Sequence, residues 1–172
     1  AFSEFDNYLL STSSIVSRNF FEYKLEFILL FLGLGIKVPL FFFHFWLPEV
    51  HGEASTSGSV VLAGLFLKFP VFGFLRFAYF FYKDFFIDFV YFSVPFFLIG
   101  SVFIGLIVYR LNDLKRVIAY SSVVHMGIAL SVFFIADERS NKAFLLYMVA
   151  HSLVTPALFF VVGAVYDILG SR

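Results

Sequence analysis

Long apolar runs alternate with short polar segments along the chain. The apolar runs cover residues 24–46, 58–80, 86–109, 113–135 and 141–168, and charged residues cluster between them. A helix needs about 20 residues to cross the ~30 Å hydrocarbon core of a bilayer, so each run is long enough to span it. An open sheet would leave backbone groups unsatisfied in lipid. The pattern therefore predicts an all-α integral membrane protein with a bundle of about five transmembrane helices.

The segments on either side of these runs have a different character. Residues 1–23 mix polar and apolar positions and lack the regions of a cleaved targeting peptide. They are predicted to form an interfacial loop or a short amphipathic helix before the transmembrane bundle, residues 24–168. Residues 169–172 are predicted to form a terminal loop. The Lys and Arg residues of the linkers are divided too evenly to indicate orientation in the membrane.

The first, second and fifth predicted spans contain Pro39, Pro70 and Pro156, and the third contains Pro95. Proline removes a backbone N–H bond and clashes with the preceding turn. The first helix is therefore predicted to break at Lys37–Pro39, and the second and fifth to be interrupted. A broken helix is tolerated at membrane depth where it lines a cavity or packs within protein. A harmless kink is the alternative at each proline.

The composition supports the membrane class and narrows the chemistry. Of the 172 residues, 61% are hydrophobic and 14% charged, and the mean hydropathy is +0.94, whereas soluble domains carry about 25% charged residues. There is no cysteine, which excludes thiolate metal sites and Fe–S ligation by this chain. The four histidines show no metal-ligand spacing, and no basic stripe indicates nucleic acid. We expect no cofactor or metal in this chain.

Phenylalanine is heavily used, with 29 residues. Because its codons are uridine-rich, this usage favours a U-rich organellar genome or transcript. A membrane protein that simply prefers phenylalanine to leucine is the alternative.

Four ionisable side chains lie inside the apolar runs: Lys37, Lys68, His125 and His151. A charge near the middle of a span costs about 2.5–3.5 kcal/mol on insertion scales, so it marks a functional site by default. Lys68 lies roughly 15 Å into its span at 1.5 Å per residue, and the other three fall near the same level. Such a row can pass a proton along the midplane, although a lone histidine is as often a core residue bonded to a carbonyl.

Hydroxyl side chains lie near the two histidines in the sequence, namely Ser121, Ser122, Ser152 and Thr155. They can support a water-filled proton wire, or equally hold helices together. No carboxylate lies in the middle of a predicted span, and the four within the span bounds lie at span ends: Glu26, Asp88, Asp113 and Asp167. An acidic partner for the lysines therefore has to come from outside this chain.

Two blocks of sequence carry a specific resemblance. Residues 37–68 contain a lysine and a proline, then His44, a Trp-Leu-Pro segment, His51, Glu53 and Gly58, and end at Lys68. Residues 113–126 closely follow the pattern D-L-K-R-x-I-A-Y-S-S-V-x-H-M. Both blocks, with a matching segment around residues 150–167, resemble subunit 4 of mitochondrial NADH:ubiquinone oxidoreductase, respiratory complex I. The resemblance covers nearly the whole chain and implies a fragment covering about the seventh to eleventh helices of a fourteen-helix antiporter-like fold.

The resemblance also implies roles for individual residues. Lys37 matches the family's lysine on a broken helix, which pairs with a glutamate on an earlier helix, and Lys68 matches the central lysine of the proton channel. His125 and His151 match the histidines that link this lysine toward the exit, and His44 matches a further polar position. Ser55, where the family usually has proline, and Pro70 depart from the pattern. The paired glutamate and the terminal channel residue have no counterpart here, so we expect a split subunit whose missing helices come from separate polypeptides.

The resemblance implies a function in proton translocation coupled to electron transfer. It also implies that FMN, Fe–S clusters and ubiquinone are bound elsewhere in the complex. The expected partners are other membrane-arm subunits of complex I and lipids, with no nucleic acid. The expected location is the mitochondrial inner membrane, as a multi-pass and mitochondrially encoded protein. Two alternatives stay open. One is a subunit of a multisubunit cation/proton antiporter, and the other is a structural scaffold fragment without a transport role.

Overall fold

The computed structural model describes residues 20–78 and 83–170, and all regular structure in these two ranges is helical. Four helical segments in them are long and apolar enough to cross a membrane: Thr56–Phe77, Phe89–Val108, Leu114–Phe134 and Glu138–Leu169. The all-α membrane class predicted from the sequence is therefore confirmed. Most of the expected interfacial segment, residues 1–19, lies outside the described residues.

The described helices follow one another with short connections. In chain order they are α2 (Phe20–Lys37), α3 (Trp46–Glu53), α4 (Thr56–Val61), the π-helical turn η1 (Leu62–Phe66), α5 (Lys68–Gly73), the π-helical turn η2 (Phe74–Ala78), α7 (Lys83–Val108), α8 (Leu114–Phe134) and α9 (Glu138–Leu169). Helices α8 and α9 begin at acidic caps, where the side chains of Asp113 and Asp137 accept bonds from backbone N–H groups of the first turn. Helix α9 ends at Gly170, whose φ of 63° suits glycine.

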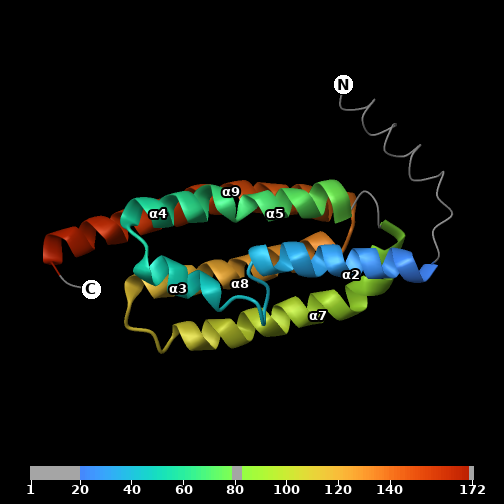
Figure 1. The fold of residues 1–172 in the computed structure, drawn as a ribbon, viewed down its shortest axis with the longest axis horizontal. Helices are drawn as coiled ribbons and strands as arrows, with labels where there is room; N and C mark the ends of the chain where they lie inside the picture. The colour runs from blue at the N-terminus through green and yellow to red at the C-terminus, as the bar shows by residue number, and fades with distance from the viewer. Residues whose placement is uncertain (1–19, 79–82, 171–172) are drawn as a thin grey trace, which may run out of the picture.

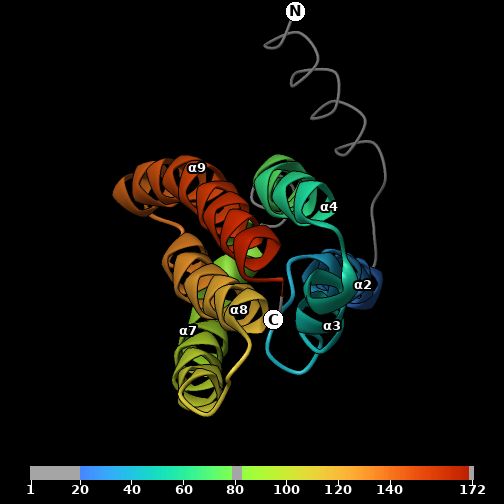
Figure 2. The ribbon, with the colours of Figure 1, turned by 90° about the vertical axis from the view of Figure 1, so that its left-hand side faces the viewer.

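The helices lie side by side as an elongated bundle (Figure 1). Helix α8 has a central position, since it packs against α7, α9 and α3. Helix α9 packs along α4 and η1, while α2 contacts α5 and η2. Figure 2, which looks along the bundle, shows α9, α8 and α7 following one another on one side and α2 with α3 on the other. The segment from α4 to η2 therefore lies against both α9 and α2.

The first span is broken where the sequence predicted. Helix α2 ends at Lys37, and α3 begins only at Trp46, which confirms the predicted break at Lys37–Pro39. The indole nitrogen of Trp46 donates to the carbonyl oxygen of Ile36 at 2.9 Å. This bond satisfies a carbonyl at the end of α2, which apolar surroundings would otherwise leave unpaired at a cost. It also ties the start of α3 to the end of α2.

Pro156 does not interrupt its helix, so this part of the prediction is wrong, whereas the second span is irregular within one turn before Pro70. Helix α9 continues through Pro156. The second span runs as one helical segment from Thr56 to Phe77, but it changes to π-helical geometry directly before Lys68 and again after Gly73. Membrane helices tolerate proline where neighbouring groups and local π adjustments satisfy the freed backbone groups. The irregularity of the second span thus takes the form of wider turns on both sides of α5.

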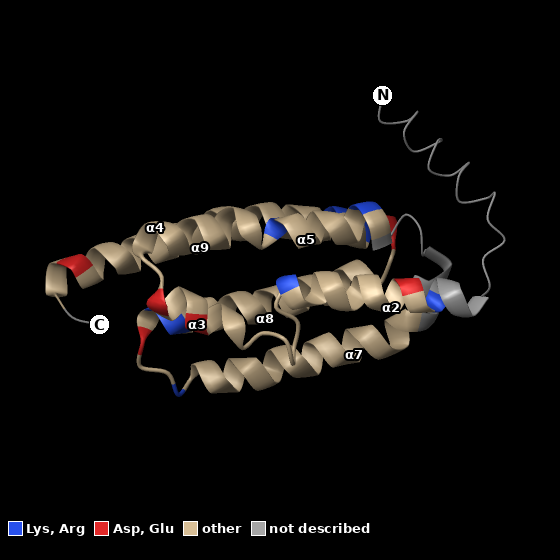
Figure 3. Ribbon diagram, in the orientation of Figure 1, with Lys and Arg blue, Asp and Glu red and all other residues tan. Residues whose placement is uncertain are grey.

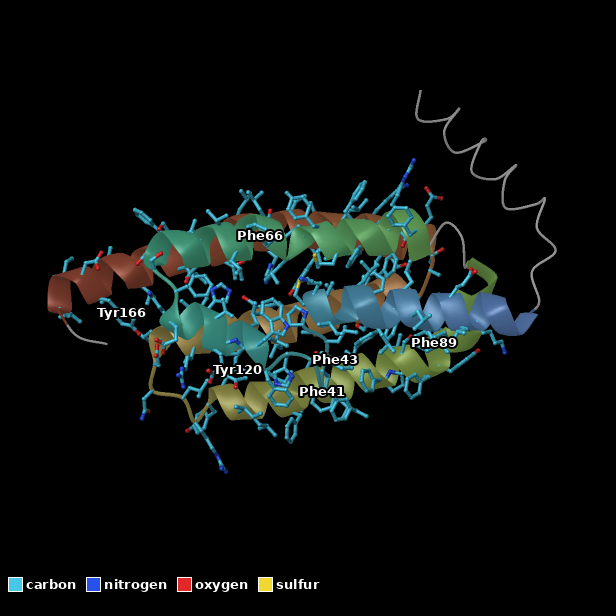
Figure 4. The ribbon with its side chains drawn as sticks, in the orientation of Figure 1. Phe41, Phe43, Phe66, Phe89, Tyr120 and Tyr166 are labelled. Carbon is cyan, nitrogen blue, oxygen red and sulfur yellow. The ribbon has the colours of Figure 1, made fainter. Side chains whose placement is uncertain are left out.

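Phenylalanine fills the main core. Rings from α2, η2, α7 and α8 meet in one cluster of buried residues, among them Phe27, Phe74, Phe97, Phe133 and Phe134. Many pairs adopt edge-to-face geometry, such as Phe31 with Phe134 at 5.7 Å and 70°, which aromatic rings prefer. Figure 4 shows Phe89, a partly buried member of this cluster, near one end of the bundle and Tyr166 near the other. The candidate site lies on α5, α8 and α9.

Candidate functional site

Charged residues lie mostly near the ends of the bundle, and lysines are isolated along its length (Figure 3). Lys68 is the first residue of α5, and Leu67 alone separates it from the π-helical turn η1. π-Helical turns in α-helices are frequent at functional sites. The lysine Nζ donates to the carbonyl oxygen of Ala63 at 2.5 Å, five residues back in the same segment. The irregular turn thus supplies a polar group to an ammonium that lies inside the bundle.

His151 of α9 provides the second contact of Lys68. Lys68 Nζ lies 3.0 Å from His151 Nδ1, which is within hydrogen-bond distance. His151 is buried, and the Thr155 hydroxyl one turn later lies 3.3 Å from the same nitrogen and also bonds to the His151 carbonyl. The other ring nitrogen, Nε2, is buried without a hydrogen-bond partner among the described residues. One side of the imidazole therefore contacts the lysine, and the other side is available for a further polar group.

His125 of α8 is the next ionisable residue beyond His151. The ring centroids of His125 and His151 are 6.0 Å apart. His125 Nδ1 lies 2.6 Å from the hydroxyl oxygen of Tyr147, which is on α9. A cavity of about 190 Å³ adjoins these groups, lined by Ser121, His125, Tyr147, His151 and Thr155 among others. This pocket is partly open and mostly apolar in its lining, with the two histidines, the tyrosine and the hydroxyl groups as its polar groups.

The Lys68 cluster, as we call Lys68, His151, His125 and Tyr147, thus joins side chains of α5, α8 and α9. The sequence pattern named three of these four residues. It missed Tyr147, although the signal was present, because a residue four positions before His151 lies on the same face of a helix. Proximity to His125 depends on how α8 packs against α9, which the sequence does not reveal.

Lys37 and His44 lie apart from this cluster. Lys37 is exposed at the end of α2, and it has no hydrogen bond or ion pair to any residue in the described ranges. His44 is 2% exposed in the break between α2 and α3, enclosed by the rings of Phe41, Phe45 and Tyr120. Figure 4 shows Phe41 and Tyr120 on this side of the bundle. Neither ring nitrogen of His44 has a hydrogen-bond partner within residues 20–78 and 83–170.

His51 is a further buried histidine that the sequence reasoning gave no role. Its ring stacks on Phe159 of α9, with centroids 4.4 Å apart, and both ring nitrogens lack a partner in the described part of the chain. Nearby on α8, the buried Lys115 donates from Nζ to the carbonyl of Ala54 at 3.2 Å. No group of three or more metal-ligating side chains occurs among the residues that the structure describes.

The arrangement suits proton transfer better than bond-breaking chemistry. Lysine and histidine exchange protons with a hydrogen-bonded neighbour, and the Lys68 cluster places such groups in sequence beside a cavity. No carboxylate contacts Lys68 in the described ranges. Fold and site together define a multi-pass helical membrane protein with ionisable groups inside its bundle.

Comparison with known proteins identifies the family. Residues 2–172 match the model of the transmembrane family described as NADH:quinone oxidoreductase/Mrp antiporter, and the chain belongs to this family. It is 41% identical over 137 residues to NADH-ubiquinone oxidoreductase chain 4 of Chondrus crispus, a match covering 80% of this chain and 28% of the relative. Chain 4 of Arabidopsis thaliana is 39% identical over 159 residues, 92% of this chain and 31% of the relative.

A bacterial relative extends the comparison. NADH-quinone oxidoreductase subunit M of Rickettsia felis is 34% identical over 143 residues, which are 83% of this chain and 29% of the relative. The chain therefore spans about three tenths of the length of these relatives. The resemblance to subunit 4 inferred from residues 37–68 and 113–126 is confirmed, and the chain corresponds to a fragment of the longer proteins.

Proposed function

We propose that this chain is a proton-translocating part of the membrane arm of a complex I-type NADH:quinone oxidoreductase. The observation that supports this most is the 3.0 Å contact between Lys68 Nζ and His151 Nδ1, inside the bundle and between two helices. A lysine at membrane depth is costly unless it is paired or lines a functional path. Here its contacts are a backbone carbonyl and an imidazole that can itself take up a proton.

The proposed path has three steps. A proton on Lys68 moves to His151 Nδ1 along their hydrogen bond. It leaves His151 from Nε2, the nitrogen without a partner in the described chain. Water in the adjoining cavity then carries it to His125, because rings with centroids 6.0 Å apart need only a short bridge.

Lys37 and His44 have separate places in this proposal. Lys37 would receive its acidic partner from a helix outside these 172 residues, since it has no ion pair in the described part of the chain. His44 would be a further polar position beside the helix break, in contact with aromatic rings. The expectation that separate polypeptides supply the missing helices stays a prediction.

The remaining parts of the activity would lie in other subunits. The relatives bear the names of NADH-ubiquinone and NADH-quinone oxidoreductase components, so we propose other membrane-arm subunits and lipids as partners. Flavin, Fe–S clusters and quinone would bind elsewhere in the complex, and this chain would contribute only proton transfer. The proposed location is the mitochondrial inner membrane, with the gene in the mitochondrial genome.

Two other functions are compatible with the family. A multisubunit cation/proton antiporter shares its description, but chain 4 and subunit M relatives favour the respiratory complex. A scaffold fragment without transport would need no cavity at the two histidines. The cavity beside His125 and His151 therefore favours transport over the scaffold.

Replacement of Lys68 by Met tests the proposal. Methionine keeps much of the length and removes the charge, so we expect Lys68→Met to lower NADH-driven proton pumping in reconstituted vesicles by roughly tenfold or more, as for loss of a bond to a charged group. NADH oxidation with an artificial acceptor should stay normal, because it reports assembly and the redox part. Lys142→Met is the matched control, since Lys142 forms an exposed pair with Glu138. Normal pumping in Lys68→Met would overturn the proposal.

A further inference from the structure

Tyr147 makes the shortest side-chain contact of His125. Its hydroxyl oxygen lies 2.6 Å from His125 Nδ1. The two rings are not stacked, because their centroids are 6.1 Å apart and their planes meet at 49°. The contact between the two residues is thus carried mainly by the hydroxyl group.

The ring of Tyr147 has a separate role in packing. Tyr147 is half-buried against the phenylalanine core, while its hydroxyl meets a histidine that is itself exposed. It lies four residues before His151 on α9, so the same helix face presents partners to Lys68 and to His125. Removal of the hydroxyl alone would keep the packing and lose the bond.

The chemistry of the two groups is complementary in both protonation states. A neutral imidazole has one donor and one acceptor nitrogen, and a protonated one has two donors. The phenol oxygen of Tyr147 can accept from Nδ1–H of His125 both in the neutral Nδ1–H tautomer and in the charged ring, and these two states differ only by the proton on Nε2. In either protonation state, the Tyr147 hydroxyl is hydrogen-bonded to Nδ1 of His125. The nitrogen of His125 that remains for exchange with water or another side chain is therefore Nε2.

We propose that Tyr147 is a positioning residue that holds His125 by Nδ1 and thereby assigns proton exchange to Nε2. The inference rests on the proposed function, since it gives His125 a defined state within the path from Lys68. Without the hydroxyl, the exposed imidazole of His125 would rotate and change tautomer freely. Only those molecules in which His125 has the required orientation and tautomer would then transfer the proton.

The test uses the assembled complex with Tyr147→Phe. We expect the rate of NADH-driven proton pumping to fall by roughly three- to tenfold, the effect of one ordinary hydrogen bond. The solvent isotope effect on pumping should rise, because transfer at His125 becomes the slow step. Tyr91→Phe is the matched control, as Tyr91 is 85% exposed on α7 and should change neither quantity.

A second variant separates positioning from a general loss of structure. In a His125→Gln complex, the additional Tyr147→Phe change should lower pumping no further, because the two residues act through one bond. Independent effects in the double variant, or normal pumping and an unchanged isotope effect in Tyr147→Phe, would overturn the inference.

The outcome is distinguishable from failure of the proposed function. If Lys68→Met loses pumping while Tyr147→Phe keeps it, the path stands and Tyr147 has no part in it. If Lys68→Met pumps normally, the proposed function itself fails, whatever Tyr147→Phe does.

Discussion

At the scale of single residues, the bundle retains a lysine because polar groups are placed around it. Lys68 has one partner from its own segment, the Ala63 carbonyl, and one from another helix, His151. The next group, His125, is bonded to Tyr147. An isolated ammonium in this position would be strongly destabilising, whereas a bonded one next to a titratable ring is ready for proton exchange.

The contact between Lys68 and His151 can be tested by combining two changes. Lys68→Met and His151→Gln should each lower the rate of proton pumping by roughly tenfold. The double variant should pump as fast as the slower of the two single variants. The reason is that both residues serve one transfer step. The initial rate of proton pumping in vesicles is measured for all three variants. Effects that multiply in the double variant would mean that the residues lie on separate paths.

At the scale of elements, the broken first span depends on close packing with α7. A Cβ at Gly100 of α7 would lie 2.7 Å from Phe41 Cβ, in the segment between α2 and α3. Phe41 in turn contacts His44 and the α7 rings Phe96 and Phe103. Glycine at this position therefore allows the break to lie against α7.

This packing predicts the effect of a single methyl group. Gly100→Ala should destabilise the fold by roughly 1–3 kcal/mol, because Phe41 is too close to move without displacing its backbone. Gly105→Ala on the same helix is the control, since nothing lies within 4 Å of its added Cβ, and alanine favours a helix by up to ~1 kcal/mol. Thermal inactivation of the assembled complex measures both. Equal stability of the two variants would contradict the packing described.

The elements also show how far the sequence could be read. Periodicity and length predicted the helices, and Pro39 predicted the break, because proline has no N–H group with which to continue the helix. Pro156 was misread, since α9 continues through it. The π-helical turns on both sides of α5 have no clear sequence signal. They depend on how this segment packs against α9 and α2, and only the folded chain reveals that.

At the scale of the whole molecule, the chain is short and two of its candidate site residues are exposed. It spans about three tenths of the length of its relatives. Lys37 is exposed without an ion pair in the described ranges. His125, at the other end of the Lys68 cluster, is exposed as well. Three of the four residues of the cluster were predicted from the sequence, whereas Tyr147 and the surroundings of the cluster in the assembly were not.

An apolar carbodiimide tests what lies beside Lys37 in the assembled complex. The reagent joins an amine directly to a carboxylate, so we expect a cross-link from Lys37 to an aspartate or glutamate outside these 172 residues. Lys142 is the internal control and should link to Glu138 of this chain, because their charged groups are 2.6 Å apart. Peptide mass spectrometry identifies both. A Lys142 link without any Lys37 link would contradict a carboxylate partner for Lys37.

The central claim is that Lys68, His151 and His125 form one continuous path for protons. A density map of the assembled complex, at a resolution that shows ordered water, tests it most directly. The account predicts water in the cavity of about 190 Å³, bonded to His151 Nε2 and leading to His125. A cavity filled by apolar side chains or lipid, with His151 Nε2 dry, would contradict it.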